Sequence, residues 1–342
     1  MLSRRAWLAA AAGALGGCAT VGGTAPLLRP PRLRPGDTVG LFGSGTRLAE
    51  DWIAQAVANV ESIGLRPKLG RHVRAAHGHY SGTVAQRVDD LHQLWADPEV
   101  RALWSIRGGA GTAQLLPHLD YAAMRRTPKA VIGYSDATAL HLALLRHAGL
   151  VCFHGPAGVS TFTPFSVDQI RAVLMDPQPR LTLERAPSHR LREADEPQFR
   201  ARTVRGGGAE GPLLGGNLSV LSALVGTPWG PRTDGALLLL EDIGELPYRV
   251  DRMLTQLELA GLLRASAGLV GGVFENCEAP PDASPRMPLA DVIDARFGSA
   301  GVPAVYGLSF GHVRDQLTLP LGVRARLDAD ALTLTLLEPA VS

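Results

Sequence analysis

The sequence predicts an α/β fold with a doubly wound parallel sheet, followed by a second α/β unit. Between residues 38 and 149, short apolar runs alternate with segments of helical periodicity, which is the order that produces parallel sheets. A similar alternation starts again near residue 236. The chain has 342 residues, more than one hydrophobic core usually holds, so two domains are expected.

The first unit combines buried strands with amphipathic helices. Its expected strands cover residues 38–42, 100–106 and 130–132, and its expected helices cover residues 52–63, 87–94, 112–119 and 136–149. Sites in such sheets lie beyond the carboxyl ends of the strands. The segments Arg107–Gly111 and Tyr134–Ser135 fall there.

The second unit begins near Gly211 and repeats the alternation. Its expected strands cover 236–240, 268–274 and 304–308, its expected helices cover 248–263 and 289–297, and the alternating segments 317–320 and 331–336 are expected to pair as a hairpin. The predicted boundaries are 37–180 for the first domain, 181–205 for an inter-domain connection rich in Arg, Glu and Pro, and 206–342 for the second domain. Gly206–Gly208 is expected to be a flexible connection, because no Lys-Ser/Thr pair follows it as in a phosphate loop.

Residues 1–18 have the features of an export signal. Arg4-Arg5 and the apolar stretch after them resemble a twin-arginine signal, and Leu15-Gly16-Gly17-Cys18 matches the lipobox of bacterial lipoproteins. The expectation is cleavage before Cys18, a lipid on its thiol, and a tether over 19–36, which places the protein at the periplasmic side of the cell envelope. The alternative is an ordinary signal peptide with a chance cysteine.

Composition narrows the classes of function. A hydrophobic content of 46% with 19% charged residues is typical of a soluble globular chain. The net charge is +2 and the basic residues form no block, so no nucleic-acid partner is expected. Cys152 and Cys277 either pair or remain two buried thiols.

The segment Gly133-Tyr134-Ser135-Asp136 has the layout of a nucleophile elbow. A buried strand ends at a Gly-x-Ser turn and a helical pattern follows at once. The helix N-terminus offers free N–H groups and partial positive charge, which suit an oxyanion. The structural alternative is that Ser135 caps the helix and Asp136 is a first-turn acid.

Two other strand ends carry chemically useful side chains. Glu241 follows the apolar run 237–240, and His312 follows Gly311 after the strand expected at 304–308. With Ser135 they form a Ser, Glu, His set, in which Ser attacks, His takes the proton and the carboxylate orients the His. Taken singly, the acid and the His would also suit solvated loops.

The chain resembles the LD-carboxypeptidase family of serine peptidases, the muramoyltetrapeptide carboxypeptidases. The resemblance spans most of residues 37–325. The matching stretches are Arg107–Gly111, Gly133–Asp136, Gly215–Leu218, Gly226–Trp229, Leu240–Met253 and Phe310–His312.

The resemblance implies a role for each matching residue. Ser135 would be the nucleophile, His312 the general base and Glu241 the orienting acid, with the N–H groups of Gly109 and Asp136 as the oxyanion hole. It also implies an N-terminal Rossmann-like domain, a smaller C-terminal α/β domain, a site in the cleft between them, and a homodimer. The chain departs from the family at Ala110, where Tyr is usual, which puts a side-chain contact to substrate in doubt.

Three further interpretations concern binding. Arg107 is expected either to bind a substrate carboxylate or to pair with Asp136 or another internal acid, and Asn217, in a matching stretch, is a second candidate for substrate binding. His72, His77 and His79 are close in sequence but have no Cys or carboxylate at ligand spacing, so no metal site is expected.

The Ser, Glu and His residues predict a serine hydrolase, and the family resemblance implies a carboxypeptidase that releases the terminal D-alanine from an L,D-linked peptidoglycan tetrapeptide. It would need no metal or nucleotide cofactor. One alternative is a hydrolase of peptide–nucleotide conjugates like the microcin C immunity proteins. Another is an inactive, lipid-anchored muropeptide-binding protein, against which the intact Ser, Glu and His argue.

Overall fold

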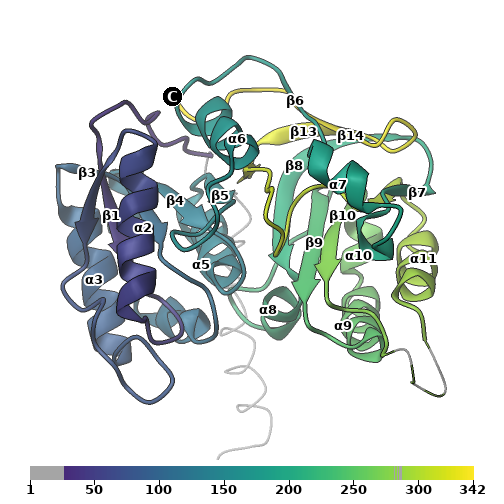
Figure 1. Cartoon of the computed structure of the whole chain (residues 1–342), viewed down its shortest axis with the longest axis horizontal. Coiled ribbons are helices and arrows are strands. Elements are labelled where there is room, and N and C mark those ends of the chain that lie inside the picture. The colour runs from purple at the N-terminus through teal and green to yellow at the C-terminus, as the bar shows by residue number, and fades with distance from the viewer. Residues whose placement is uncertain (1–26, 281, 283, 285–286) are drawn as a thin grey trace, which may run out of the picture.

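The computed structural model describes residues 27–280, 282, 284 and 287–342, which form two β-sheets side by side with helices packed on them (Figure 1). The first sheet has six strands in the order β12-β5-β4-β3-β1-β2, and the second has eight in the order β6-β14-β13-β8-β9-β10-β11-β7. The predicted α/β class and the arrangement in two units are confirmed.

The first sheet has a parallel body of five strands. These strands are β1 (Thr38–Phe42), β2 (Arg66–Leu69), β3 (Val100–Ser105), β4 (Ala130–Gly133) and β5 (Cys152–His154). Its helices are α2 (Glu50–Ser62), α3 (Val84–Ala96), η1 (Thr112–His118), α4 (Tyr121–Arg126), α5 (Ala137–Ala143), η2 (Leu144–Ala148) and α6 (Pro164–Leu174). The carboxyl ends of the parallel strands therefore meet at one edge, as a doubly wound sheet requires.

The second sheet is mixed. Its parallel centre consists of β8 (Gly208–Asn217), β9 (Leu237–Ile243), β10 (Gly268–Glu275) and β11 (Ala304–Tyr306). Antiparallel strands extend both sides: β7 (Arg202–Arg205), β13 (Arg324–Asp328), β14 (Thr333–Leu336) and β6 (Leu181–Leu183). The helical elements of this half are α7 (Pro187–Arg192), η3 (Pro197–Phe199), α8 (Leu218–Ala223), α9 (Pro247–Leu259), α10 (Leu262–Ala265) and α11 (Leu289–Ser299).

Each sheet is covered by apolar side chains on both faces. In β9, Leu237 and Leu239 join one core cluster, and Leu238 and Leu240 join the other, as the two-residue period of a strand dictates. Helices α2 and α6 pack on one face of the first sheet, while α3 and α5 pack on the other. Both clusters continue from one sheet to the other, so the two halves share their cores.

The C-terminal segment differs from the expected hairpin. Residues 319–321 form β12, which pairs antiparallel with β5 of the first sheet, and the hairpin forms instead between β13 and β14. The prediction that 317–320 pairs with 331–336 was therefore wrong, because alternation identifies a strand but not its partner. The chain thus returns to the first sheet after it has built most of the second.

Two other segments contain more structure than their composition indicates. Residues 181–205, expected to connect the domains, hold β6, α7, η3 and β7, so they also supply edge strands to the second sheet. The single helix expected over 248–263 is interrupted at Gly261, where φ is +77° and α9 gives way to α10.

Residues 1–26, which carry the expected export signal and Cys18, lie outside the described residues. Among the described residues, no helix combines the length and apolar character needed to cross a membrane. Cys152 and Cys277 are both buried free thiols, so they do not form the disulfide that was one of the two alternatives.

Candidate active site

Ser135 lies on a strained turn between β4 and α5. Its φ is +62°, a left-handed conformation that only three non-glycine residues adopt in the described chain. Such a conformation is disfavoured for a residue with a Cβ and is held only when the surroundings impose it. Helix α5 begins two residues later, at Ala137. The strand–turn–helix geometry of a nucleophile elbow is therefore present.

The glycine-rich turn after β3 packs directly on this serine. A Cβ at Gly108 would lie 2.8 Å from Ser135 Oγ, and a Cβ at Gly109 would lie 1.9 Å from Thr46 Oγ1. Gly109 also has φ +109°. Both positions therefore require glycine, because any side chain would collide with the elbow or with Thr46.

Thr46 fixes the position of this turn. Its Oγ1 accepts a hydrogen bond from the backbone N–H of Ala110 at 3.2 Å and contacts His79 Nε2 at 2.9 Å. Within the part of the chain that the structure describes, the N–H groups of Gly109 and Asp136 donate no hydrogen bond. These two donors are free to bind an oxyanion beside Ser135.

The Asp136 side chain is held inside the protein. It is 4% exposed, and its Oδ2 accepts hydrogen bonds from the backbone N–H and the hydroxyl of Thr112 at 2.9 and 2.7 Å. Burial raises the pKa of Asp136 above its usual value, although the bonds from Thr112 act in the opposite direction. Arg87, a buried cation on α3, faces this region and donates to the carbonyls of Ser44 and Gly111.

Arg107 forms no ion pair with a carboxylate of the described residues. Its guanidinium lies over the Trp52 ring, 4.3 Å from the centroid. Of the two interpretations of Arg107, pairing with Asp136 or another internal carboxylate is therefore not seen. The stacked cation stays available at the end of β3.

Glu241 and His312 form a hydrogen-bonded pair in the second half of the chain. His312 Nδ1 lies 2.8 Å from Glu241 Oε2, and the side chains are 13% and 0% exposed. A Cβ at Gly311 would lie 3.0 Å from Glu241 Oε2, and Gly311 has φ +110°, so glycine lets the loop approach the carboxylate.

The pair shifts both pKa values. Burial alone lowers the pKa of His312, but the charge of Glu241 and the hydrogen bond to it outweigh burial and raise that pKa above its usual value. For Glu241, burial acts to raise the pKa, but the charge of His312 and the shared hydrogen bond hold it below its usual value. The geometry thus favours an ionised acid that orients an imidazole.

The fold brings the two halves of the site together. The ring of Tyr134, which precedes Ser135, stands edge-on to the His312 imidazole with centroids 4.8 Å apart. β12, close behind His312 in sequence, pairs with β5 next to the elbow strand. In the described residues Ser135 Oγ donates no hydrogen bond to His312. Such bonds often tighten only when substrate binds.

Asn217 lies behind the acid. It is 4% exposed, stands opposite Glu241 in the β8–β9 pairing, and caps α8 by accepting from the N–H of Val220. Its Nδ2 donates to Asp242 Oδ1 at 3.0 Å. The side-chain amide predicted to bind substrate is therefore engaged by protein groups.

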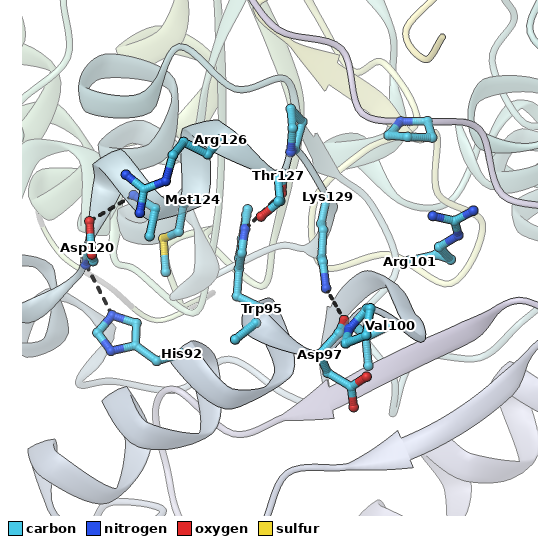
Figure 2. A pocket seen from close by; sticks show the side chains of 15 residues that line it. His92, Trp95, Asp97, Val100, Arg101, Asp120, Met124, Arg126, Thr127 and Lys129 are labelled. Carbon is cyan, nitrogen blue, oxygen red and sulfur yellow. Dashed lines mark hydrogen bonds between the residues drawn. The ribbon is translucent and has the colours of Figure 1, made fainter.

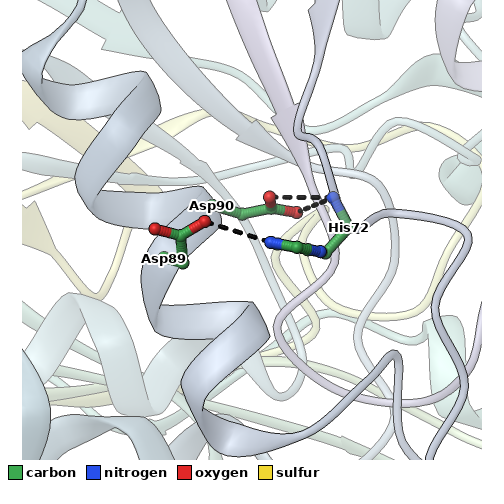
Figure 3. A group of neighbouring side chains, drawn as sticks. All are labelled: His72, Asp89 and Asp90. Carbon is green, nitrogen blue, oxygen red and sulfur yellow. Dashed lines mark hydrogen bonds and ion pairs between the residues drawn. The ribbon is translucent and has the colours of Figure 1, made fainter.

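The three histidines considered for metal binding contact different groups. His72 contacts Asp89 Oδ2 through Nε2 at 3.0 Å, and its backbone N–H donates to Asp90, so α3 brings two carboxylates beside it (Figure 3). His79 binds Thr46, and the backbone of His77 pairs with Tyr80. The carboxylates near His72 were missed because they lie 17 and 18 residues away in sequence.

Figure 2 shows a cavity of about 720 Å³ in the first half of the chain. Its lining includes Val100 and Lys129, at the amino ends of β3 and β4, and the side chains of Trp95 and Met124. Lys129 Nζ donates to the carbonyls of Leu94 and Asp97 at the end of α3. Ser135 follows the carboxyl end of β4, where sites in parallel sheets lie, so this cavity is separate from the candidate active site.

Comparison with known families gives matches to both halves of the chain. The LD-carboxypeptidase N-terminal domain matches residues 39–155, and the LD-carboxypeptidase C-terminal domain matches residues 210–327. The first match contains Ser135 and the second contains Glu241 and His312.

Relatives align over nearly the whole chain. A probable murein peptide carboxypeptidase from Bacillus subtilis is 34% identical over 92% of this chain and 95% of its own length. A murein tetrapeptide carboxypeptidase from Pseudomonas aeruginosa is 33% identical over 86% of this chain and 94% of its own.

Solved structures show the same fold. The microcin C7 self-immunity protein MccF in complex with glutamyl sulfamoyl guanosine superposes with a TM-score of 0.82 at 26% identity, covering 92% of this chain and 100% of that one. A muramoyltetrapeptide carboxypeptidase from Oxalobacter formigenes gives a TM-score of 0.76 at 29% identity, with coverages of 87% and 97%.

Proposed function

This chain belongs to the LD-carboxypeptidase family and is a serine-type enzyme, and we propose that it releases the terminal D-alanine from the L,D-linked tetrapeptide of peptidoglycan. The observation that carries the proposal is a strained serine, Ser135, whose neighbour Tyr134 contacts an imidazole that a buried carboxylate orients. The murein tetrapeptide carboxypeptidase relative supports the choice of substrate.

The proposal gives each residue of the triad a role. Ser135 Oγ attacks the carbonyl carbon of the bond before D-alanine, while His312 Nε2 takes the hydroxyl proton. His312 Nδ1–H donates to Glu241, whose carboxylate stabilises the imidazolium. The N–H groups of Gly109 and Asp136 hold the oxyanion of the tetrahedral intermediate.

The reaction then divides into two halves. His312 gives its proton to the amine of D-alanine, the C–N bond breaks, and an ester to Ser135 remains. A water molecule, deprotonated by His312, attacks this ester, and Ser135 Oγ leaves with the proton. The products are free D-alanine and a peptide one residue shorter, so the balance needs no cofactor.

A carboxypeptidase must also recognise the free carboxylate of its substrate. Arg107 is suited to this task because its guanidinium is stacked on Trp52, has no acid partner among the described residues, and borders the oxyanion turn. A planar guanidinium binds a carboxylate through two parallel hydrogen bonds. We assign this role to Arg107 within the proposal.

A second substrate class is favoured by the close superposition on MccF with a glutamyl sulfamoyl nucleoside. The same triad would attack the carbonyl of an aminoacyl sulfamate. The two classes differ in the leaving group, which is an amino acid in one case and a nucleoside sulfamate in the other. The products therefore distinguish them.

The test is incubation of the purified protein with muropeptide tetrapeptide and, separately, with glutamyl sulfamoyl guanosine, followed by mass spectrometry. We expect the tetrapeptide to lose the mass of one alanine, and Ser135→Ala to abolish this loss. Release of the nucleoside sulfamate with an intact tetrapeptide would select the second class. If neither product forms, both substrate classes are contradicted.

The cellular setting is part of the proposal. Export through the twin-arginine signal, a lipid on Cys18 and a position in the cell envelope would place the enzyme near its polymer. A homodimer, which the family resemblance implies, is retained as a prediction that size-exclusion chromatography with light scattering can check.

A further inference from the structure

Several buried polar atoms behind the triad lack hydrogen-bond partners. Glu241 Oε2 is bonded to His312, but Oε1 has no partner in the described structure. Both ring nitrogens of His154, a residue with 1% exposure, are also without one. Buried polar groups are almost always satisfied, so an unpartnered acceptor and an unpartnered potential donor behind the same site require an explanation.

His154 lies between the elbow, the loop that carries His312 and strand β8. It ends β5 in register with Gly133 of the elbow strand. Its ring stands edge-on to Tyr134 and to Phe310, with centroid distances of 6.2 and 5.9 Å. These rings belong to the elbow and to the loop that carries His312.

The ring also reaches the strand beside the acid. A Cβ at Gly216 would lie 3.3 Å from His154 Nδ1, so the imidazole packs against β8 at this glycine. The next residue, Asn217, stands opposite Glu241 in the sheet, and its amide is directed to Asp242. Asn217 uses one of its two amide N–H groups on Asp242, whereas neither ring nitrogen of His154 has a partner among the described residues, so His154 is a further buried donor that can serve the acid.

The charge state of His154 suits a donor. Burial lowers the pKa of His154 to about 4, against the opposing effect of Glu241 and together with that of His312. His141 on α5, also buried, has its pKa lowered to about 3 by burial and by His154. At neutral pH His154 therefore carries one N–H and no charge. It can satisfy a carboxylate oxygen without replacing His312 as the cation.

We propose that His154 is a positioning residue of the triad, whose buried neutral imidazole donates a hydrogen bond to Glu241 Oε1, directly or through one buried water. With both oxygens held, the carboxylate cannot rotate, and Oε2 stays aligned with His312. This inference rests on the proposed triad mechanism but not on the tetrapeptide as substrate.

The test measures the rate at which a fluorophosphonate labels Ser135, followed by intact-protein mass spectrometry. His154→Phe keeps an aromatic ring among Tyr134 and Phe310 but removes the donor, whereas His154→Gln restores an N–H. We expect His154→Phe to lower the rate about tenfold or more, and His154→Gln to recover most of it. When Glu241 is already replaced by Ala, His154→Phe should change the labelling rate by less than about twofold, because the carboxylate that His154 is proposed to position is gone.

A matched control is His189. It is 1% exposed, both its ring nitrogens are unpartnered, burial lowers its pKa to about 4, and it packs edge-on against Phe199. His189→Phe should cost stability in a thermal melt yet change the labelling rate by the same small factor with or without Glu241. An equal effect of His154→Phe in both backgrounds would mean a structural role and would overturn the inference.

A second measurement serves if His154→Phe does not fold. In wild-type protein, ¹⁵N NMR of the histidine rings should show His154 with one protonated nitrogen at neutral pH, and its N–H resonance should move in Glu241→Gln. An unmoved resonance would overturn the inference. If the wild type is labelled and the His154 variants are labelled at the same rate, this inference alone is contradicted. If the wild type is not labelled at all, the proposed triad is contradicted as well.

Discussion

His312 Nδ1 lies 2.8 Å from Glu241 Oε2, and the carboxylate is fully buried beneath it. The acid comes from β9, whereas the imidazole comes from a loop that leads into β12 of the other sheet. Gly311 pairs with Val273 of β10, so the second sheet holds both partners, and the chain's return to the first sheet through β12 sets His312 beside the elbow. Activity and the docking of the two sheets should be linked.

Ser135 and His312 should act as one unit. Ser135→Ala or His312→Ala is expected to lower kcat by on the order of 10⁴-fold, and the double variant should be little slower than either, because each change already removes the proton-transfer step. Steady-state kinetics on a tetrapeptide measure this. Losses that multiply in the double variant would argue against a shared step.

The pH profile should report the pairing of His312 with Glu241. The base works only when neutral, and its pKa is raised, so kcat/KM should fall as pH drops through a midpoint above about 6.5, the ordinary value for histidine. In Glu241→Gln the charge is lost while burial remains, so the acid limb should move to lower pH as kcat falls. If the midpoint of the acid side of the pH profile does not move in this variant, a group other than His312 determines it.

The glycine-rich turn gives a test of the oxyanion hole. Gly109→Ala places a Cβ 1.9 Å from Thr46 Oγ1 at φ +109°, so the turn must shift and misplace its N–H. We expect kcat to fall by about 10²-fold or more with a smaller change in KM. Gly64→Ala is the matched control, because it has φ +86° and no atom within 4 Å of the added Cβ. Equal kinetics in both variants would remove Gly109 from the mechanism.

Local patterns were sufficient to predict the elbow. An apolar run, a Gly-x-Ser turn and a helical period predict the strand–turn–helix geometry seen at Ser135. The position of Glu241 was predicted only in part, because β9 continues to Ile243 and the acid therefore lies within a buried strand, not after its end. The pairing of β12 with β5 could not be predicted, because registry between strands about 165 residues apart leaves no local signal. Arg87 and His154 were missed for a related reason. Their partners come from distant loops, so the sequence gives no sign that they are buried beside the site.

Membrane attachment should depend on Cys18. Cys18→Ser removes the thiol that would carry the lipid, so the protein should move from the membrane pellet to the soluble fraction. The activity of the soluble variant should persist, because the proposed catalytic residues begin more than 100 positions later. Cell fractionation with an immunoblot measures this. Arg4→Lys with Arg5→Lys is the companion variant, which should block export instead. An unchanged pellet fraction for Cys18→Ser would argue against lipidation.

Arg107 should determine recognition of the substrate carboxylate. Arg107→Met keeps an unbranched apolar side chain beside Trp52 but removes the guanidinium, so KM for the tetrapeptide should rise about tenfold or more, with a smaller change in kcat. Arg107→Lys should recover only part of the loss, because an ammonium cannot form two parallel hydrogen bonds. A tetrapeptide ending in an amide gives the decisive comparison. The wild type should bind it as weakly as Arg107→Met binds the free acid, and Arg107→Met should not distinguish acid from amide. A variant that still prefers the free acid would show that another cation reads the carboxylate, and Arg107 would then serve to brace the turn against Trp52.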